Sequence, residues 1–374
     1  MKQIGLTIAF MLSGIISVGA QKAAVKFVNK ENDKKVEVYV DDKLFTAYFY
    51  PDDMKKQSLY PIISASGKDI TRGYPCNPKP FERVDHPHHV GLWFNFGDVN
   101  GLDFWNNSFA IKAEEKHRYG TVRFKKVASQ NSKKGELVTI ADWVDSKGNA
   151  LLEEETIFIF SGTTVRSGSV ASVDATTSAS PIVSADDMLT SSSGSAVTSV
   201  AALRTIERIT KLTAKQEVVF TENKEGLIGL RVDRAFEEPS MKSEKLLDAN
   251  GLDTEVLAMN NDGVNGIYRN AEGVKGGDVW SKRSQWVALR ADKEGEVITI
   301  VIIDHSKNPN YPAWSHARGY GLFATNNLGG TAFEKDATPV KIRLKPSKTI
   351  TFRHKIVIGG DFTDEDINKI ANNF

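Results

Sequence analysis

Apolar and polar side chains alternate with a period of two wherever the chain shows a clear pattern. The segment 36–49, VEVYVDDKLFTAYF, alternates on both sides of Asp41-Asp42 and is typical of a β-hairpin. Turn residues divide two longer alternating segments in the same way. The further predicted strand pairs are 136–160 with a turn at 146–149, 284–303 with a turn at 292–295, and the pair formed by 340–344 and 349–358.

These strand pairs predict antiparallel meanders, because the pattern lacks the interleaved helices that a parallel sheet requires. Only the tail 363–374, TDEDINKIANNF, has a helical beginning, since Thr363 is placed to cap the first amides and Ile367 and Ile370 share a face. The predicted fold is all-β, a large antiparallel β-sandwich with a short C-terminal helix, in a single domain over residues 21–374.

The segment 161–202 departs from this pattern, because Ser, Thr, Ala, Val and Gly dominate it while aromatic and charged side chains are few. Such a composition buries little apolar area. We interpret the segment as a low-complexity insertion at the surface, with a flexible lid as the alternative.

The first 20 residues have the composition of a leader. Lys2 precedes an apolar run over 4–18, and the small residues Gly19 and Ala20 stand before Gln21, as in a cleaved secretory signal peptide. We therefore expect a periplasmic or secreted protein. No later segment reaches 18 consecutive apolar residues, so membrane insertion is not expected.

Cysteine content and charge narrow the expectations further. The single cysteine, Cys76, cannot form an internal disulfide, so stability must come from a large core. The chain has 48 basic side chains, Lys2 among them, and 47 acidic ones, so the charges balance once the leader is removed. This balance gives no reason to expect nucleic acid as a partner.

Three of the seven histidines fall in the stretch 85–105, DHPHHVGLWFNFGDVNGLDFW. In an extended segment His86 and His88 share a face and His89 points oppositely, unless Pro87 breaks the strand. Histidines at the end of a buried strand are suited to acid–base catalysis, metal binding or hydrogen bonding to a polar ligand. The alternative is that they are structural and satisfied by backbone carbonyls and Asp85.

Two tryptophans and an arginine accompany this cluster. Within GLWFNF, Trp93 is expected in the core, whereas Trp105 follows a turn and is the better candidate for a stacking platform. Arg72, in the loop YPIISASGKDITRGYP, carries a planar fork of donors suited to carboxylates or vicinal hydroxyls. A surface salt bridge is the alternative for Arg72.

A second cluster with the same character lies over 302–323, directly after the predicted buried strand VITIVII. Two clusters at strand ends are what a shared cleft looks like in a sequence. The candidate residues in this second cluster are Asp304, His305, Trp314, His316 and Arg318.

We expect both clusters to line one cavity and assign the roles accordingly. His89 and His305 are the candidates for acid–base catalysis, with Asp85 and Asp304 fixing their tautomers. The candidates for ligand binding are Arg72, His86, His88, Trp105, Trp314, His316 and Arg318.

Four stretches of the chain resemble a family of exported bacterial proteins labelled "methane oxygenase PmoA". They are YPIISASGKDITRGYP, DHPHHVGLWFNFGDVNGLDFW, KEGLIGLRVDRAFE and SQWVALRADKEGEVITIVIIDHSKNPNYPAWSHARGYGLFATNN. Membrane methane oxygenase subunits span the bilayer several times, so the label does not describe this chain. The family is similar to the galactose-mutarotase-type β-supersandwiches, and this resemblance implies a sugar-binding cleft on one broad sheet. It further implies that Arg and His contact the sugar hydroxyls and that a His and a carboxylate act as acid and base.

Three functions are compatible with these residues. The first is a carbohydrate-active enzyme, an epimerase, hydrolase or lyase, with a carbohydrate as its partner and no cofactor. The second is a non-catalytic carbohydrate-binding protein, which needs the same lining but no imidazole and carboxylate across a ligand-sized gap. The third is a metal-dependent enzyme with His86, His88 and His305 as ligands, although no standard ligand spacing supports a metal.

Overall fold

The computed structural model describes residues 21–164 and 202–374. Two large antiparallel sheets make up most of this part of the chain. The nine-stranded sheet contains, in spatial order, β15 (Ile267–Asn270), β16 (Trp286–Lys293), β17 (Glu296–Asp304), β21 (Thr349–Gly359), β10 (Leu203–Ala214), β9 (Ala150–Thr164), β8 (Glu136–Val144) and β7 (Thr121–Asn131), with β1 (Gln21–Lys22) paired to the end of β9. The eight-stranded sheet contains β18 (Trp314–Arg318), β19 (Leu322–Asn326), β12 (Gly226–Arg231), β6 (Leu92–Phe96), β5 (Ser58–Ile62), β4 (Lys43–Phe49), β3 (Lys35–Val40) and β2 (Val25–Lys30).

Smaller elements complete the described part. Two short sheets pair β11 (Val218–Thr221) with β20 (Lys341–Leu344) and β13 (Glu244–Leu247) with β14 (Asp253–Val256). The 3-10 turns are η1 (Glu31–Asp33), η2 (Ala113–Arg118), η3 (Arg234–Phe236), η4 (Gly276–Val279) and η5 (Gly330–Ala332), and the α-helix is α1 (Asp364–Asn372). None of the helices in the described ranges is long and apolar enough to cross a membrane.

The main core lies between the two large sheets. Alternate side chains of β6, Leu92 and Phe94, point into it from one sheet, and Phe158, Ile206 and Ile300 point into it from the other. This two-layer packing follows from the period-two alternation, because each strand places every second side chain on the same face. The expected antiparallel β-sandwich with a short C-terminal helix is confirmed.

The hairpin predictions hold with one exception. The three predicted turns connect β3 to β4, β8 to β9, and β16 to β17. The segments 340–344 and 349–358 do contain strands, but they do not pair with each other, since β20 pairs with β11 and β21 lies between β10 and β17. Alternation reveals a strand but does not select its partner.

The predicted insertion begins later than expected. Its first residues belong to β9, where Ser161 and Thr163 pair with Thr205 and Leu203 of β10. The remainder of the segment, 165–201, and the predicted leader lie outside the described residues.

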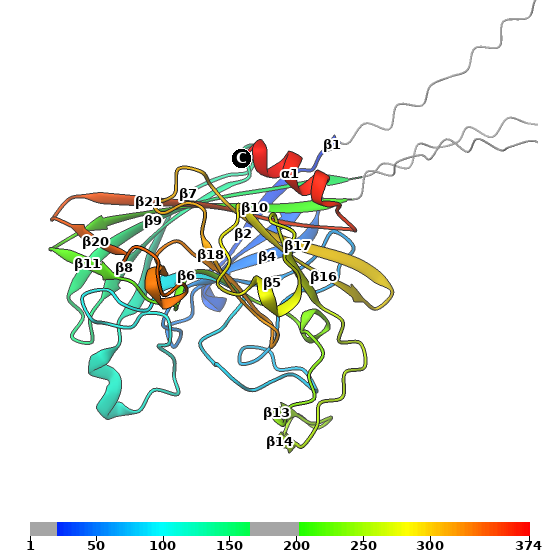
Figure 1. Ribbon diagram of the computed structural model, residues 1–374. Helices are drawn as coiled ribbons and strands as arrows, with labels where there is room; N and C mark the ends of the chain where they lie inside the picture. The colour runs from blue at the N-terminus through cyan, green and yellow to red at the C-terminus, as the bar shows by residue number, and fades with distance from the viewer. Residues whose placement is uncertain (1–20, 165–201) are drawn as a thin grey trace, which may run out of the picture.

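The two sheets are covered differently on the faces that point away from the core. On the nine-stranded sheet α1 packs over β16, β17 and β21, with Ile367 and Ala371 against Trp286 and Val301. Figure 1 shows α1 at the top, and the β13–β14 hairpin projecting at the opposite end of the molecule. On the eight-stranded sheet no helix of the described residues covers Trp93, Trp105, Leu322 and Ala324, which form a small separate cluster.

Candidate functional site

The three clustered histidines lie in a tight turn. The amide of His89 donates to the carbonyl of His86 at 2.9 Å, and His86 has a φ of 45°. Proline fits the second position of such a turn. The turn replaces the extended segment, so the expectation that His89 points away from His86 is wrong: the two rings are parallel, with centroids 4.8 Å apart.

This turn builds a column of rings on the outer face of the eight-stranded sheet. His86 stacks on Tyr320 at 5.1 Å, and His89 stacks on Trp93 at 5.1 Å. The ring of Trp105 lies 6.1 Å from His89 and 6.3 Å from His316. One histidine of the second cluster, His316, therefore does reach the first cluster, through Trp105.

A glycine makes this aromatic packing possible. Gly229 on β12 pairs with Trp93 on β6. A Cβ at position 229 would lie 2.6 Å from the Trp93 ring and 2.9 Å from the Trp105 ring, too close for any side chain. Both tryptophans are fully buried, so the face of Trp105 is covered and is not an open stacking platform.

Arg72 holds the backbone of the turn. Its guanidinium donates to the carbonyls of Arg83, Asp85, His86 and His89 at 2.8–3.3 Å, and to the Asp85 carboxylate at 2.6 Å. The side chain is almost completely buried. Because these contacts occupy both terminal nitrogens, Arg72 acts mainly to fix the shape of the turn.

Arg231 connects Asp85 to His89. It donates to the Asp85 carboxylate at 2.6 Å and to Nδ1 of His89 at 3.4 Å, and its guanidinium lies 4.9 Å from the Tyr320 ring. A guanidinium only donates, so Nδ1 of His89 accepts and the ring proton is assigned to Nε2. His89 therefore presents a donor, and Arg231, rather than Asp85, fixes its tautomer.

Asp85 instead orients His86. Burial raises the pKa of Asp85, but Arg231, His86 and Arg72 together hold it well below its usual range, so the group is a carboxylate. Its Oδ2 accepts a hydrogen bond from Nδ1 of His86 at 2.6 Å. Nε2 of His86 then carries a lone pair, and 41% of the side chain is exposed. This is the arrangement of an oriented general base.

The other imidazoles of the site are held neutral. Burial lowers the pKa of His88 to about 2 and that of His316 to about 3, and nearby cationic groups add to the effect. Burial and the neighbouring His88 lower the pKa of His89 well below its usual value. Neutral imidazoles bind a ligand through hydrogen bonds and not through charge.

Buried polar atoms without a hydrogen-bond partner concentrate at this site. Native proteins pair the great majority of buried polar atoms, so each unpaired one requires an explanation. The unpaired atoms here are Nε2 of His88, Nε2 of His89, Nε1 of Trp93, Nε1 of Trp105, Nδ1 of His316, Nε of Arg72 and Nε of Arg231.

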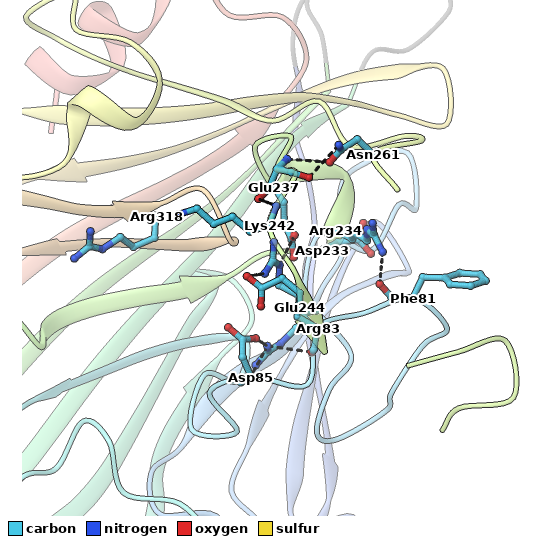
Figure 2. Close-up of polar contacts among 12 residues, drawn as sticks. Phe81, Arg83, Asp85, Asp233, Arg234, Glu237, Lys242, Glu244, Asn261 and Arg318 are labelled. Atoms are coloured by element: carbon cyan, nitrogen blue, oxygen red, sulfur yellow. Dashed lines mark hydrogen bonds and ion pairs between the residues drawn. The ribbon is translucent and has the colours of Figure 1, made fainter. Parts of the chain in front are cut away.

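A buried ion pair supports the strand segment that leads into the turn. Arg83 donates to Glu237 and Glu244, each at 2.7 Å. Figure 2 shows Arg83 between these two carboxylates, with Asp85 below it. Arg83 and Glu237 are almost completely buried, so this pair fixes the position from which Asp85 extends.

Besides Arg231, the ionisable residues Glu225 and Lys56 were missed in the sequence. Glu225 lies before β12, where burial raises its pKa although Lys224 opposes the shift. Lys56 lies before β5 and donates to the carbonyl of Trp105 at 2.6 Å. Both stand in charged runs, NKEG and DDMKKQ, which are typical of solvated turns, so composition alone offered no signal.

Asp304 and His305 are not part of this site, so the expectation that they line the same cavity is corrected. Asp304 accepts hydrogen bonds from Asn308 and Asn327, and burial raises its pKa to about 6. His305 contacts Arg353 at 3.1 Å and the ring of Phe374 at 5.1 Å. Phe374 packs beside α1 on the outer face of the nine-stranded sheet, so β17 delivers His305 to the other side of the sandwich.

Trp314 and Arg318 flank His316 on β18 but contact other groups. Trp314 is buried between Arg283, at 4.4 Å, and Phe333, at 6.5 Å. Arg318 lies 4.6 Å from the ring of Trp280. In Figure 2 its guanidinium points away from the group around Asp85. These two predicted ligand contacts therefore lie beside the column of rings and not in it.

No metal site is evident in the described residues. Within 21–164 and 202–374, no three His, Cys, Asp or Glu side chains are arranged to hold a metal ion. The set considered from the sequence, His86, His88 and His305, is divided between the two sides of the sandwich.

The comparison with protein families decides the membership of the chain. A family model described as "Family of unknown function (DUF6807)" matches residues 35–372. The chain belongs to this family. The DUF6807 match replaces the methane oxygenase label, which finds no support, and the search of curated proteins found no match.

Three solved structures illustrate what this DUF6807 chain is similar to. A GH36 α-galactosidase of Geobacillus stearothermophilus in complex with raffinose is 9% identical, with a TM-score of 0.31, over 91% of this chain and 41% of that one. A galactose mutarotase related enzyme of Lactobacillus acidophilus is 9% identical, with a TM-score of 0.28, over 91% and 98%. An α-galactosidase of Lactobacillus brevis is 9% identical, with a TM-score of 0.28, over 90% and 39%. This chain thus spans about two fifths of either α-galactosidase.

Proposed function

We propose that this protein is an exported carbohydrate-active protein that binds a saccharide on the outer face of the eight-stranded sheet. The observation that carries the proposal is the concentration of unpaired polar atoms around the turn of His86 to His89. A hydroxyl both donates and accepts, so a saccharide at the exposed edge can pair with the imidazole lone pair of His86. Groups of the saccharide that enter between the rings can pair with the buried indole N–H groups and with the Nε2–H of His89. The leader-like composition of residues 1–20 supports export.

The small number of free charges at the site favours a ligand rich in hydroxyls. Arg72 and Arg231 share the carboxylate of Asp85, and the imidazoles of His89 and His316 are held neutral by burial. Most recognition at the column of rings is therefore by directed hydrogen bonds. His86 and Tyr320 are its more exposed members, so a ligand meets them first.

The same site is equipped for proton transfer. Nε2 of His86 is the base, and Asp85 is a positioning residue that fixes its tautomer. Burial raises the pKa of Glu225, which favours the protonated form that can donate a proton back. A base and an acid acting on one saccharide are the requirement shared by epimerisation, hydrolysis and elimination.

Binding and turnover of a saccharide panel test this function. Calorimetry would identify a ligand among plant and host oligosaccharides, and proton NMR would follow its conversion. We expect His89→Gln to weaken binding about tenfold, the effect of losing about 1.4 kcal/mol of hydrogen bonding. His86→Gln should abolish turnover while leaving the dissociation constant within about threefold, because Gln keeps the size but not the basicity.

The matched control is His117→Gln, since His117 lies on η2 and caps the carbonyl of Glu114. It should change neither quantity. Unchanged binding in His89→Gln, or the absence of any saccharide ligand, would count against the proposal. Binding without turnover in the unmodified protein would identify a non-catalytic carbohydrate-binding protein.

A further inference from the structure

A pocket of about 320 Å³ opens on the side of the turn that carries His88. Its lining comes from the loop before β5, from the turn itself and from the loop after Trp105. The polar and charged residues that line it are Asp53, Lys55, Lys56, Cys76, His88, Asn107 and Ser108. The ring of His88 lies 4.3 Å from that of His89, so the pocket adjoins the column of rings through His88.

Lys56 is a buried cation without an ion-pair partner among the described residues. It is 4% exposed, its Nζ donates to the carbonyl of Trp105 at 2.6 Å, and it lies 5.5 Å from the Trp93 ring. A buried ammonium that lacks a counter-ion is costly. Consistent with this cost, burial lowers the pKa of Lys56 to about 7, although Asp103 and Glu225 oppose the shift.

Two neighbours supply further hydrogen-bonding capacity. Nε2 of His88 is buried and has no partner. The hydroxyl oxygen of Ser108 accepts from the amide of Ala110 at 3.3 Å, which leaves its proton available to donate. An anion would pair with Lys56 and accept from both of these groups, whereas an apolar ligand would leave all three unsatisfied.

We propose that this pocket binds an anionic substituent, a carboxylate or a sulfate ester, of the saccharide that occupies the column of rings. The inference rests on the proposed function, since it assigns an acidic saccharide as the ligand class. His88 lines the pocket, and its ring centroid lies 5.6 Å from that of His86, so one sugar residue is long enough to contact both the pocket and His86. Among the described residues, Asp53 is the one carboxylate that lines the pocket, and its side chain is exposed.

The test compares D-glucuronate with its neutral methyl ester by calorimetry. We expect the acid to bind the unmodified protein at least about tenfold more tightly than the ester. Lys56→Gln should remove this preference. Lys355→Gln is the matched control, because Lys355 is also partly buried, has a pKa lowered by burial and lies 4.3 Å from an aromatic ring, but belongs to the nine-stranded sheet; it should keep the preference.

Proton uptake provides a second readout that does not depend on the variant folding. At pH 8 the Lys56 amine is mostly neutral, and pairing with a carboxylate restores its charge. Binding of glucuronate should then take up protons, measured from the buffer dependence of the binding enthalpy, and binding of the ester should take up none. Asp53, Lys55, Cys76, His88, Asp103 and Glu225 are the other titratable groups near the amine. Repeating the measurement on Lys56→Gln separates any proton uptake by these groups from uptake by the amine.

The outcomes separate this inference from the proposed function. Equal affinities for acid and ester, or a preference that persists in Lys56→Gln, would overturn the anion pocket. If neutral saccharides still bind in a His89-dependent way, the proposed function survives that result. If no saccharide binds but inorganic sulfate does, in a Lys56-dependent way, the pocket is a site for a free anion and the acidic saccharide is refuted.

Discussion

The outer faces of the two sheets both bury tryptophan, but they satisfy it differently. Under α1, Nε1 of Trp286 donates to the side chain of Asn368 at 2.8 Å. On the eight-stranded sheet, Nε1 of Trp93 and Nε1 of Trp105 have no partner. One face is closed by a helix of the same chain that completes both its apolar packing and its hydrogen bonds. The other is packed as closely but leaves these indole N–H groups unpaired, and this difference is what supports the proposed ligand-binding role of the eight-stranded sheet.

The largest effect on stability is expected at Arg72, which clamps the turn of His86 to His89. This turn shapes the outer face of the eight-stranded sheet, the incomplete face, on which the N–H groups of Trp93 and Trp105 are unpaired. Arg72→Met removes the guanidinium that donates to the carbonyls of Arg83, Asp85 and His89 and leaves the His86 carbonyl only the amide of His89 as donor. It also removes one of the two guanidinium cations at Asp85. Breaking one partner out of a buried charge network costs about 3 to 5 kcal/mol, measurable by urea denaturation. Arg290→Met removes a more exposed pair with Asp361 and should cost less than about 1 kcal/mol. Similar losses for both variants would contradict the clamp.

The helix-covered face should respond in stability alone. Ile367→Ala empties a fully buried position between α1 and the nine-stranded sheet, and we expect a loss of about 2 to 4 kcal/mol. Ile370→Ala, on the same helix but half-buried, should lose less. Neither change should alter saccharide affinity. An altered affinity would contradict the view that the helix-covered face takes no part in ligand binding.

Acid should lower the free energy of unfolding, because the buried histidines on the incomplete face are neutral in the native state. The pKa of His316 is lowered to about 3 in the native state, so below about pH 6.5 the unfolded chain takes up a proton that the native protein does not. Stability therefore falls as pH drops from 7 towards 3, by about 2 kcal/mol between pH 7 and 5 for this residue. His316→Gln should flatten the pH dependence by that amount, and an unchanged slope would contradict the neutral assignment.

The smallest effect separates the tryptophans themselves. Trp286→Phe loses a made hydrogen bond, whereas Trp93→Phe removes a donor that has no partner. After the common loss of ring volume, we expect Trp286→Phe to cost about 1 kcal/mol more. Trp93→Phe should instead weaken saccharide binding. The reverse order of stabilities would mean that Trp93 is satisfied in the free protein.

The alternation of apolar residues and the clustering of titratable residues were sufficient to predict the features that depend on local sequence. The hairpins followed from period-two patterns, and the histidine stretch was recognised because titratable groups are concentrated there. The turn at Pro87 was considered only as an exception, so the facing of His89 was wrong. Asp304 and His305 resemble the first cluster in sequence, but β17 belongs to the other sheet.

The remaining site residues come from strands that are distant in sequence. Arg231 stands in GLIGLRVDRAFE and has the local pattern of a core strand. Its amide donates to the carbonyl of Gly91 at 2.9 Å, so the pairing of β12 with β6 brings its guanidinium to the turn. Tyr320 reaches His86 through the loop between β18 and β19. Strand order in a sheet of eight is a tertiary property that no single segment encodes.

The most direct test of the incomplete face is to record the indole N–H resonances of the six tryptophans during titration with the saccharide found by the panel. We predict that the signals of Trp93 and Trp105 shift, because their N–H groups gain an acceptor or lie beside the bound ring, while that of Trp286, already paired with Asn368, does not. Unmoved signals from Trp93 and Trp105 under saturating ligand would contradict the account.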